Sequence, residues 1–289
     1  MVIGGDGMKN LFRIILLGLL VFFLPHTVAH AGTENGVGIE DNRNGTVTIK
    51  YSNSSNAKIA VTVKKNGTNT QYNYFLSDRE IVSDIPLTGG NGVYQISVLK
   101  NVVDSKYSPL SSEQVSLVLK DSKSAFTTSN EMITWEHTNN AIKKANQLTF
   151  KYKSQSSKIK SIYKYLVTNY HYDYDKYGRN TSGDLSYYTP DIDKTYAEKK
   201  GICYDMAALT ASMMRSVGVQ TQMVTGYPTS KYYNGSQYHA WNKVYFKRYR
   251  KWVVMDITCD MCLYEQGTKY TKLTMKKRAS EYSNVRYIW

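Results

Sequence analysis

Hydrophobic and polar residues alternate with a period of two in the chain before residue 120. The alternation recurs in four short segments that are separated by turn sequences such as Asn44-Gly45 and Asn66-Gly67. These segments are 46–51, 58–63, 93–98 and 114–119. Short alternating strands at this spacing predict a small antiparallel β-sandwich-like domain over residues 32–120. The region has no Cys and no His, so we expect no catalytic role for it.

The period changes after a polar stretch at residues 121–130, which we interpret as a linker. Beyond this stretch, apolar residues recur at helical spacing and predict a helix over residues 156–169. The apolar positions are Ile159, Ile162, Tyr163, Leu166 and Val167. The switch from a period of two to a helical period indicates a second, mixed domain over residues 131–289.

The first 31 residues have the pattern of an export signal. Lys9 and Arg13 precede the apolar run 14–24, and Ala29-His30-Ala31 gives a small-x-small cleavage pattern. The run is shorter than the roughly 20 residues that span a bilayer. We therefore expect cleavage after Ala31 and a secreted, extracellular protein associated with the cell wall; an uncleaved anchor is the alternative.

The composition is globular and strongly basic. Hydrophobic residues make up 42%, which excludes general disorder, and 37 Lys and Arg against 23 Asp and Glu give a net charge of +14. Such an excess attracts anionic polymers. For an exported chain we expect these to be wall polymers rather than nucleic acid, since no nucleic-acid motif is present. The 26 tyrosines suit half-exposed surfaces and grooves, and nucleotide bias is the alternative explanation.

Cys203 is predicted to begin a helix that ends at Gly218. One face of this helix is marked by Met206, Leu209, Met213 and Val217. The unpaired N–H groups and the dipole at a helix N-terminus favour a thiolate, which is the nucleophilic form of cysteine. A small buried core thiol is the alternative.

Two later segments, 237–246 and 251–257, predict a hairpin with a charged tip at residues 247–250. If the turn is centred between Lys247 and Arg248, His239 lies directly opposite Asp256. Their Cβ atoms would then be about 4.5–5.5 Å apart on one face. The hairpin would supply a base and its orienting carboxylate. A helix bearing Cys203 against this sheet would complete a Cys-His-Asp arrangement.

These three residues lie within a longer pattern. It consists of Gly201-Ile202-Cys203-Tyr204-Asp205, Gly226, His239-Ala240-Trp241-Asn242, Trp252 and Asp256-Ile257-Thr258. The pattern resembles the signature of the transglutaminase-like superfamily over about residues 156–259. The resemblance implies an α+β, papain-like catalytic domain with Cys203 as nucleophile, His239 as general base and Asp256 as orienting residue. The superfamily includes cross-linkers, peptidases, amidases and inactive relatives, so membership does not fix the reaction.

Two aromatic residues are weaker candidates at this site. Tyr172 matches a position where relatives often carry an aromatic residue, and we expect it either to help bind the oxyanion or to pack. Trp241, next but one to His239, is expected to contact substrate.

The pair Cys259 and Cys262 forms a C-x-x-C sequence without a second pair. A zinc site would need two further ligands, so we expect no metal. In an exported chain a local disulfide is expected, and two free thiols are the alternative. Asp260 competes with Asp256 as orienting carboxylate, but it lies beyond the strand, so Asp256 is preferred. Asp205 is expected to stabilise the start of its helix.

The combined expectation is an exported cysteine-dependent enzyme, either a peptidase or amidase or an acyltransferase. It would cleave or exchange amide bonds of envelope polypeptides or peptidoglycan peptides, with hydrolysis slightly favoured over cross-linking and without a cofactor. The alternative is a non-catalytic envelope-binding module that keeps the fold. The intact Cys, His and Asp argue against that alternative, because a degenerate copy has no physical need for all three.

Overall fold

The computed structural model describes residues 36–181, 189–233, 235 and 237–289. The predicted export signal, residues 1–31, lies outside the described residues. Among the described helices, none is both long and apolar enough to cross a membrane.

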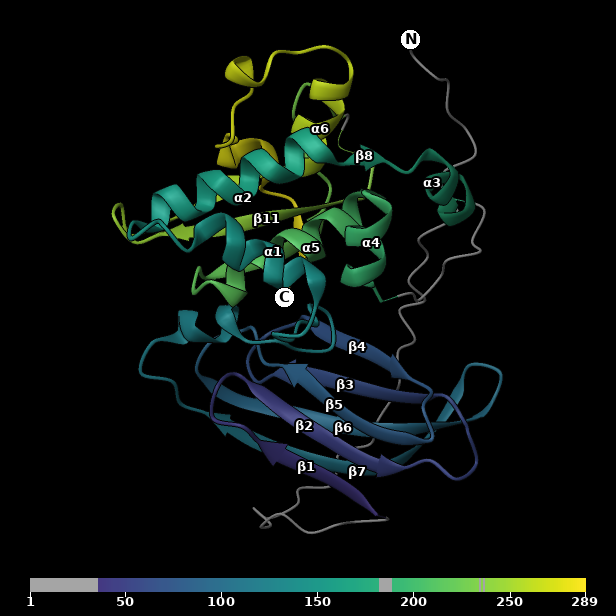
Figure 1. The fold of residues 1–289 in the computed structure, drawn as a ribbon. Helices are drawn as coiled ribbons and strands as arrows, with labels where there is room; N and C mark the ends of the chain where they lie inside the picture. The colour runs from purple at the N-terminus through teal and green to yellow at the C-terminus, as the bar shows by residue number, and fades with distance from the viewer. Residues whose placement is uncertain (1–35, 182–188, 234, 236) are drawn as a thin grey trace.

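The N-terminal part of the chain is a sandwich of two antiparallel sheets (Figure 1). Alternate residues of the strands, such as Val61 and Val63, are buried between the sheets, while Thr62 and Lys64 are more exposed. One sheet has the order β1 (Val37–Asp41), β2 (Thr46–Ser52), β5 (Glu80–Pro86). The other has the order β4 (Gln71–Leu76), β3 (Ile59–Lys65), β6 (Gly92–Val103), β7 (Lys106–Leu117). The four predicted strands are confirmed as β2, β3, β6 and β7, whereas β1, β4 and β5 escaped prediction.

The C-terminal part is an α+β unit in which helices cover an antiparallel sheet. The sheet has the order β12 (Lys251–Met255), β11 (His239–Phe246), β10 (Thr221–Gly226), β13 (Val285–Ile288). The helices are α1 (Asn140–Thr149), α2 (Gln155–Asn169), α3 (Tyr174–Thr181), α4 (Ile192–Glu198), α5 (Cys203–Ser216) and α6 (Ile257–Glu265). Two further strands, β8 (His171–Tyr172) and β9 (Lys200–Gly201), pair in parallel. The predicted helices at 156–169 and from Cys203 are confirmed as α2 and α5.

The polar stretch 121–130, interpreted above as a linker, holds a short 3-10 helix, η1 (Ser122–Thr127). Asp121 caps it by accepting a hydrogen bond from the backbone N–H of Lys123. Phe126 is buried, and its ring lies edge-on to Trp252 of β12 at 5.4 Å between centroids. The segment therefore packs against the C-terminal sheet instead of running as an extended connection.

The last residues of the chain join the two parts of the molecule. Thr88, which follows β5, donates a hydrogen bond from its hydroxyl to the carbonyl of Ile288, at 2.6 Å. The Trp289 ring is 8% exposed and lies against Tyr72 of the sandwich and Tyr204 of α5, with ring centroids 6.2 and 6.4 Å away. Because Tyr204 directly follows Cys203, this cluster ties the sandwich to the start of α5.

Removing the Trp289 ring should weaken this joint. We expect Trp289→Ala to lower the free energy of unfolding by about 3 kcal/mol, since large aromatic truncations in a core cost about 3–5 kcal/mol. Urea unfolding followed by circular dichroism measures the loss. Phe150→Ala is the matched control, because Phe150 is 82% exposed and its truncation should cost about 0.5 kcal/mol or less. Equal losses in the two variants would show that the cluster does not couple the two parts.

Candidate active site

Cys203 is the first residue of α5, and its side chain is half-buried. The turn before it is held by Asp205, whose Oδ2 accepts a hydrogen bond from the backbone N–H of Ile202 at 3.0 Å. The other oxygen of Asp205 accepts from Lys176 of α3 at 2.8 Å. The predicted role of Asp205 at the helix start is thereby confirmed. Gly201 is required by close approach, because a Cβ there would lie 2.8 Å from the Cβ of Asp205.

His239 begins β11, and its ring meets Asp256 behind the cysteine. The His239 Nε2 to Asp256 Oδ2 distance is 3.0 Å, and the two side chains are 3% and 0% exposed. The predicted contact is therefore present, but the predicted register is wrong by two residues. Phe246 pairs with Lys251 across a four-residue tip, with Arg250 at φ 52°. Asp256 consequently lies past the end of β12 and caps α6 instead of facing His239 across the hairpin.

Four donors surround the Asp256 carboxylate. Its Oδ1 accepts the backbone N–H of Cys259 at 3.0 Å, which caps α6. Its Oδ2 accepts the Tyr282 hydroxyl at 2.8 Å and the Tyr233 hydroxyl at 3.0 Å, in addition to His239. The Tyr233 hydroxyl is also 3.0 Å from His239 Nε2. Protein donors therefore provide the hydrogen bonds that water would otherwise donate to this buried carboxylate.

Sequence reasoning missed both tyrosines. Tyr233 lies in the loop between β10 and β11, and Tyr282 lies in the 3-10 helix η3 (Ala279–Tyr282). Neither stands in a periodic pattern, and nothing distinguishes them from the other tyrosines among the 26 of the chain. Only the fold shows that they converge on Asp256.

The electrostatics of this pair indicate an imidazolium and a carboxylate. Burial alone would lower the pKa of His239, but the charge of Asp256 and the nearby Cys203 outweigh burial and raise it. Burial alone would raise the pKa of Asp256, but the charge and hydrogen bond of His239 hold it below its usual value. His239 therefore contacts Asp256 and lies near Cys203, an arrangement that is compatible with a base between a nucleophile and an orienting carboxylate.

Trp241 supports His239 instead of facing substrate, which corrects the prediction made for it. Its side chain is 1% exposed. Its ring stacks on that of His239 with a centroid distance of 6.3 Å and an interplanar angle of 16°. Gly226 makes room for this packing, since a Cβ there would lie 3.0 Å from the Trp241 ring and 2.1 Å from the carbonyl of Asn284.

Tyr172 lies beside the cysteine. It belongs to β8, which pairs with β9 so that Tyr172 is opposite Gly201, two residues before Cys203. Burial raises the pKa of its hydroxyl, and the nearby Cys203 raises it further. The hydroxyl is therefore protonated at neutral pH and able to donate a hydrogen bond.

Cys259 and Cys262 are free thiols in α6, so the expected disulfide is absent from the structure. Cys259 is buried, with its backbone committed to the Asp256 cap. Asp260 lies away from the histidine and accepts hydrogen bonds from the Tyr163 hydroxyl and the Lys277 ammonium, at 2.8 and 2.6 Å. It forms its own buried ion pair, so the geometry favours Asp256 over Asp260. The described residues contain no cluster of three or more metal-binding side chains.

Comparison with known families agrees with this geometry. The family model described as the Transglutaminase-like superfamily matches residues 142–257, which include all three residues of the site. This segment belongs to the transglutaminase-like superfamily. Members of the superfamily are generally enzymes, either cysteine peptidases or acyltransferases.

The relatives found share only part of the chain. The UPF0252 protein MJ1282 of Methanocaldococcus jannaschii is 37% identical over 106 residues, which cover 34% of this chain and 29% of that protein. Among solved structures, the "Putative Cysteine Protease from Cytophaga hutchinsonii" has a TM-score of 0.39 at 15% identity, covering 69% of this chain and 64% of its own. Red sea bream transglutaminase has a TM-score of 0.31 at 10% identity, covering 75% and 48%.

The ion pair predicts a pH dependence of stability. The pKa of His239 rises from 6.5 to about 10 on folding. The contribution of protonated His239 to the free energy of unfolding is therefore complete below pH 6.5 and is lost as the pH rises through about 10. The free energy of unfolding of the wild type should fall between pH 7 and pH 10 by more than that of Asp256→Asn, in which the charge partner is missing. Urea titrations across this range measure the difference. Parallel curves for the two proteins would mean that no ion pair forms.

Proposed function

We propose that this protein is a cysteine-dependent acyl-transfer enzyme that acts on amide bonds of polypeptides. The observation that carries the proposal is the half-buried Cys203 at the start of α5, backed by the buried His239–Asp256 pair. A pair held apart from water by Tyr233 and Tyr282 keeps the imidazole in one orientation, with one nitrogen directed to the carboxylate and the other available to the thiol. The superfamily match of residues 142–257 supports the same reaction class.

The proposed reaction passes through a thioester. The Cys203 thiolate attacks the carbonyl carbon of an amide, and the tetrahedral intermediate collapses as the carbon–nitrogen bond breaks. The leaving amine takes its proton from the His239 imidazolium. Water or a second amine then attacks the thioester while His239 accepts its proton, and the carbon–sulfur bond breaks to release the Cys203 thiolate beside the imidazolium. The products are a carboxylic acid with water and a new amide with an amine.

The developing oxyanion needs donors near Cys203. The backbone N–H of Cys203 is one of the first N–H groups of α5, which have no acceptor within the helix. The Tyr172 hydroxyl is the proposed second donor, because it lies beside the thiol and is protonated at neutral pH. Tyr172→Phe would remove the donor while keeping the ring.

The setting of the reaction is also a proposal. The signal-like residues 1–31 and the sandwich domain favour an exported enzyme that acts on envelope polypeptides or peptidoglycan peptides. Hydrolysis is slightly favoured over cross-linking. The competing proposal is a non-catalytic envelope-binding module. The hydrogen-bonded site argues against it, since binding alone does not require a buried ion pair beside a thiol.

The central test uses mass spectrometry of products from candidate envelope peptides, with and without an added primary amine. Cys203→Ala should abolish both hydrolysis and amine incorporation while leaving the circular dichroism spectrum unchanged, because it removes only one sulfur atom. Cys262→Ser, a second half-buried thiol, is the matched control and should keep activity. Turnover retained in Cys203→Ala would end the proposal, and the ratio of the two products distinguishes peptidase from acyltransferase.

A second test separates the roles of His239 and Asp256. Asp256→Asn should lower kcat by about 10²–10⁴-fold, because the imidazole loses the partner that holds its tautomer and stabilises its charge. Adding this change to His239→Ala should cost little beyond His239→Ala alone, since members of one catalytic unit are not additive. Single-substrate kinetics of the three variants measure this. Losses that multiply would show that Asp256 does not act through His239.

A further inference from the structure

The positive charge of this chain is concentrated in two segments. Residues 137–172 contain seven lysines and residues 266–280 contain five Lys and Arg, and neither segment contains an Asp or Glu. The remaining 25 Lys and Arg are nearly balanced by the 23 Asp and Glu. The net charge is therefore a local feature of the molecule, which a uniform compositional bias would not produce.

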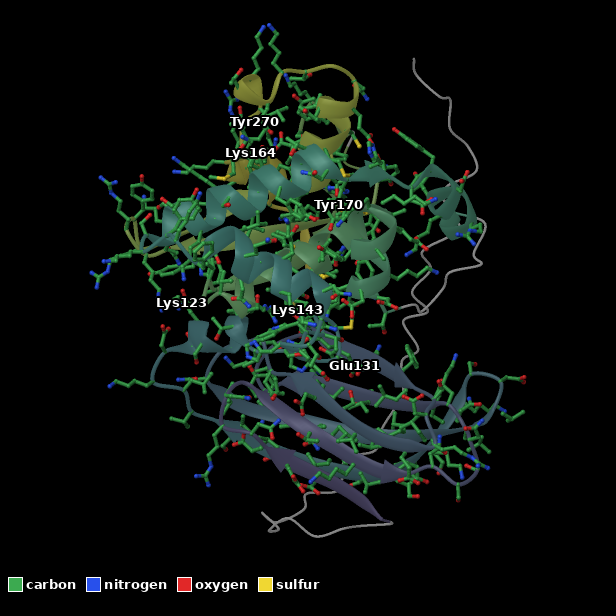
Figure 2. The ribbon with its side chains drawn as sticks, in the orientation of Figure 1. Lys123, Glu131, Lys143, Lys164, Tyr170 and Tyr270 are labelled. Atoms are coloured by element: carbon green, nitrogen blue, oxygen red, sulfur yellow. The ribbon has the colours of Figure 1, made fainter. Side chains whose placement is uncertain are left out.

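The two segments meet at α2, where Tyr270 of the second segment lies beside Lys164 and lines one side of an open groove. The groove has a volume of about 470 Å³ and is lined by Lys160 and Lys164 of α2 together with Tyr152, Tyr165 and Tyr270. Figure 2 shows Lys164 and Tyr270 next to one another, and the Lys164 ammonium is 5.7 Å from the centre of the Tyr270 ring. Among the residues that the structure describes, no Asp or Glu lines the groove, and no lining residue belongs to the cysteine site.

The groove lysines have no neutralising partner among the described residues. No carboxylate lies within 4.0 Å of Lys160 or Lys164, although ion pairs of that length occur elsewhere in the described chain. Further lysines lie at the rim, with Lys144 5.2 Å from the centre of the Tyr165 ring and Lys151 5.3 Å from that of Tyr152. Like charges gathered without counter-charges repel one another, and a bound anion would relieve that repulsion.

The basic surface continues from the groove to the tip of the β11–β12 hairpin. The tip, residues 247–250, contributes Lys247, Arg248 and Arg250, all exposed. It is joined to the start of α2 because Gln155 accepts from the backbone N–H of Lys247, at 2.9 Å. It is joined to the second basic segment because the Lys276 ammonium is 4.6 Å from the centre of the Tyr249 ring. A ligand long enough to leave the groove would therefore meet further cations.

We propose that this surface, the groove together with the hairpin tip, binds an anionic polymer in which phosphodiester groups link small polyol units. The cations in the groove are lysines, which attract a phosphate as point charges and do not need the two-oxygen geometry that an arginine fork matches. The half-buried tyrosine rings offer apolar faces on which polyol units pack. Such a surface holds the chain on a polyanionic layer, whatever reaction Cys203 performs.

The test measures binding of the full chain to poly(glycerol phosphate) by isothermal titration calorimetry at several salt concentrations. The wild type should bind with an affinity that falls steeply as salt rises, because bound phosphates release counterions. The double variant Lys160→Gln/Lys164→Gln should bind roughly tenfold more weakly at low salt and should show a shallower salt dependence. These lysines lie on the surface, so the fold should persist, and circular dichroism checks this.

The matched control is Lys64→Gln/Lys106→Gln, which removes the same charge from two exposed lysines of the sandwich. It should bind like the wild type. Equal weakening in both double variants would mean that net charge alone attracts the polymer. That result would overturn the proposal that the groove is the binding site. Equally tight binding of polyglutamate, which has no phosphate, or of single-stranded DNA, whose phosphodiesters link nucleosides, would overturn the assignment to a polyol phosphate chain. Neutral dextran should not bind. Because the readout is binding, a failure here is distinct from a failure of the Cys203 proposal.

Discussion

The buried contact between His239 and Asp256 is the interaction on which the C-terminal part of the molecule depends. Burying two opposite charges away from water costs free energy unless the remaining donors and acceptors of both groups find hydrogen-bond partners in the protein. Here the carboxylate is filled by the N-terminus of α6, by Tyr282 and by Tyr233. The start of α6, the 3-10 helix η3, the loop that holds Tyr233 and the start of β11 must therefore all lie around Asp256 for either charge to be buried. The site is a constraint on the fold as well as a product of it.

The sandwich takes part in the same constraint through the end of the chain. Trp289 lies between the sandwich and Tyr204, the neighbour of Cys203. On the other side of Cys203, the β8–β9 pair holds Gly201, and the N–H of Ile202 donates to the Asp205 side chain. The thiol is thus positioned from both sides along the chain, by backbone pairing before it and by aromatic packing after it. A domain without Cys or His still bears on the chemistry, because it supports the residue that follows the nucleophile.

The sequence was informative where local periodicity and the chemistry of single residues decide the outcome. The helices at α2 and α5, four of the seven sandwich strands, and the three members of the site follow from spacing alone or from the resemblance. The hairpin register could not be predicted in this way. It depends on the conformation of the four-residue tip, in which Arg250 has a positive φ. The contact between His239 and Asp256 is present for a different reason, because Asp256 follows the end of β12 and caps α6. Tyr233, Tyr282 and the burial of Trp241 required the tertiary fold, because no local pattern encodes a convergence of distant segments.

Three of the tyrosines donate hydrogen bonds to buried carboxylates. Asp256 receives two phenol hydroxyls and Asp260 receives one, from Tyr163. Burial raises the pKa of all three phenols, and the nearby carboxylates raise it further. Each hydroxyl therefore stays protonated at neutral pH and remains a donor. A phenol donates the hydrogen bond that water would otherwise donate. Its ring also packs as an apolar group in the protein interior. Compositional bias supplies tyrosines anywhere in the chain, but it does not direct three of them at the two carboxylates flanking the start of α6.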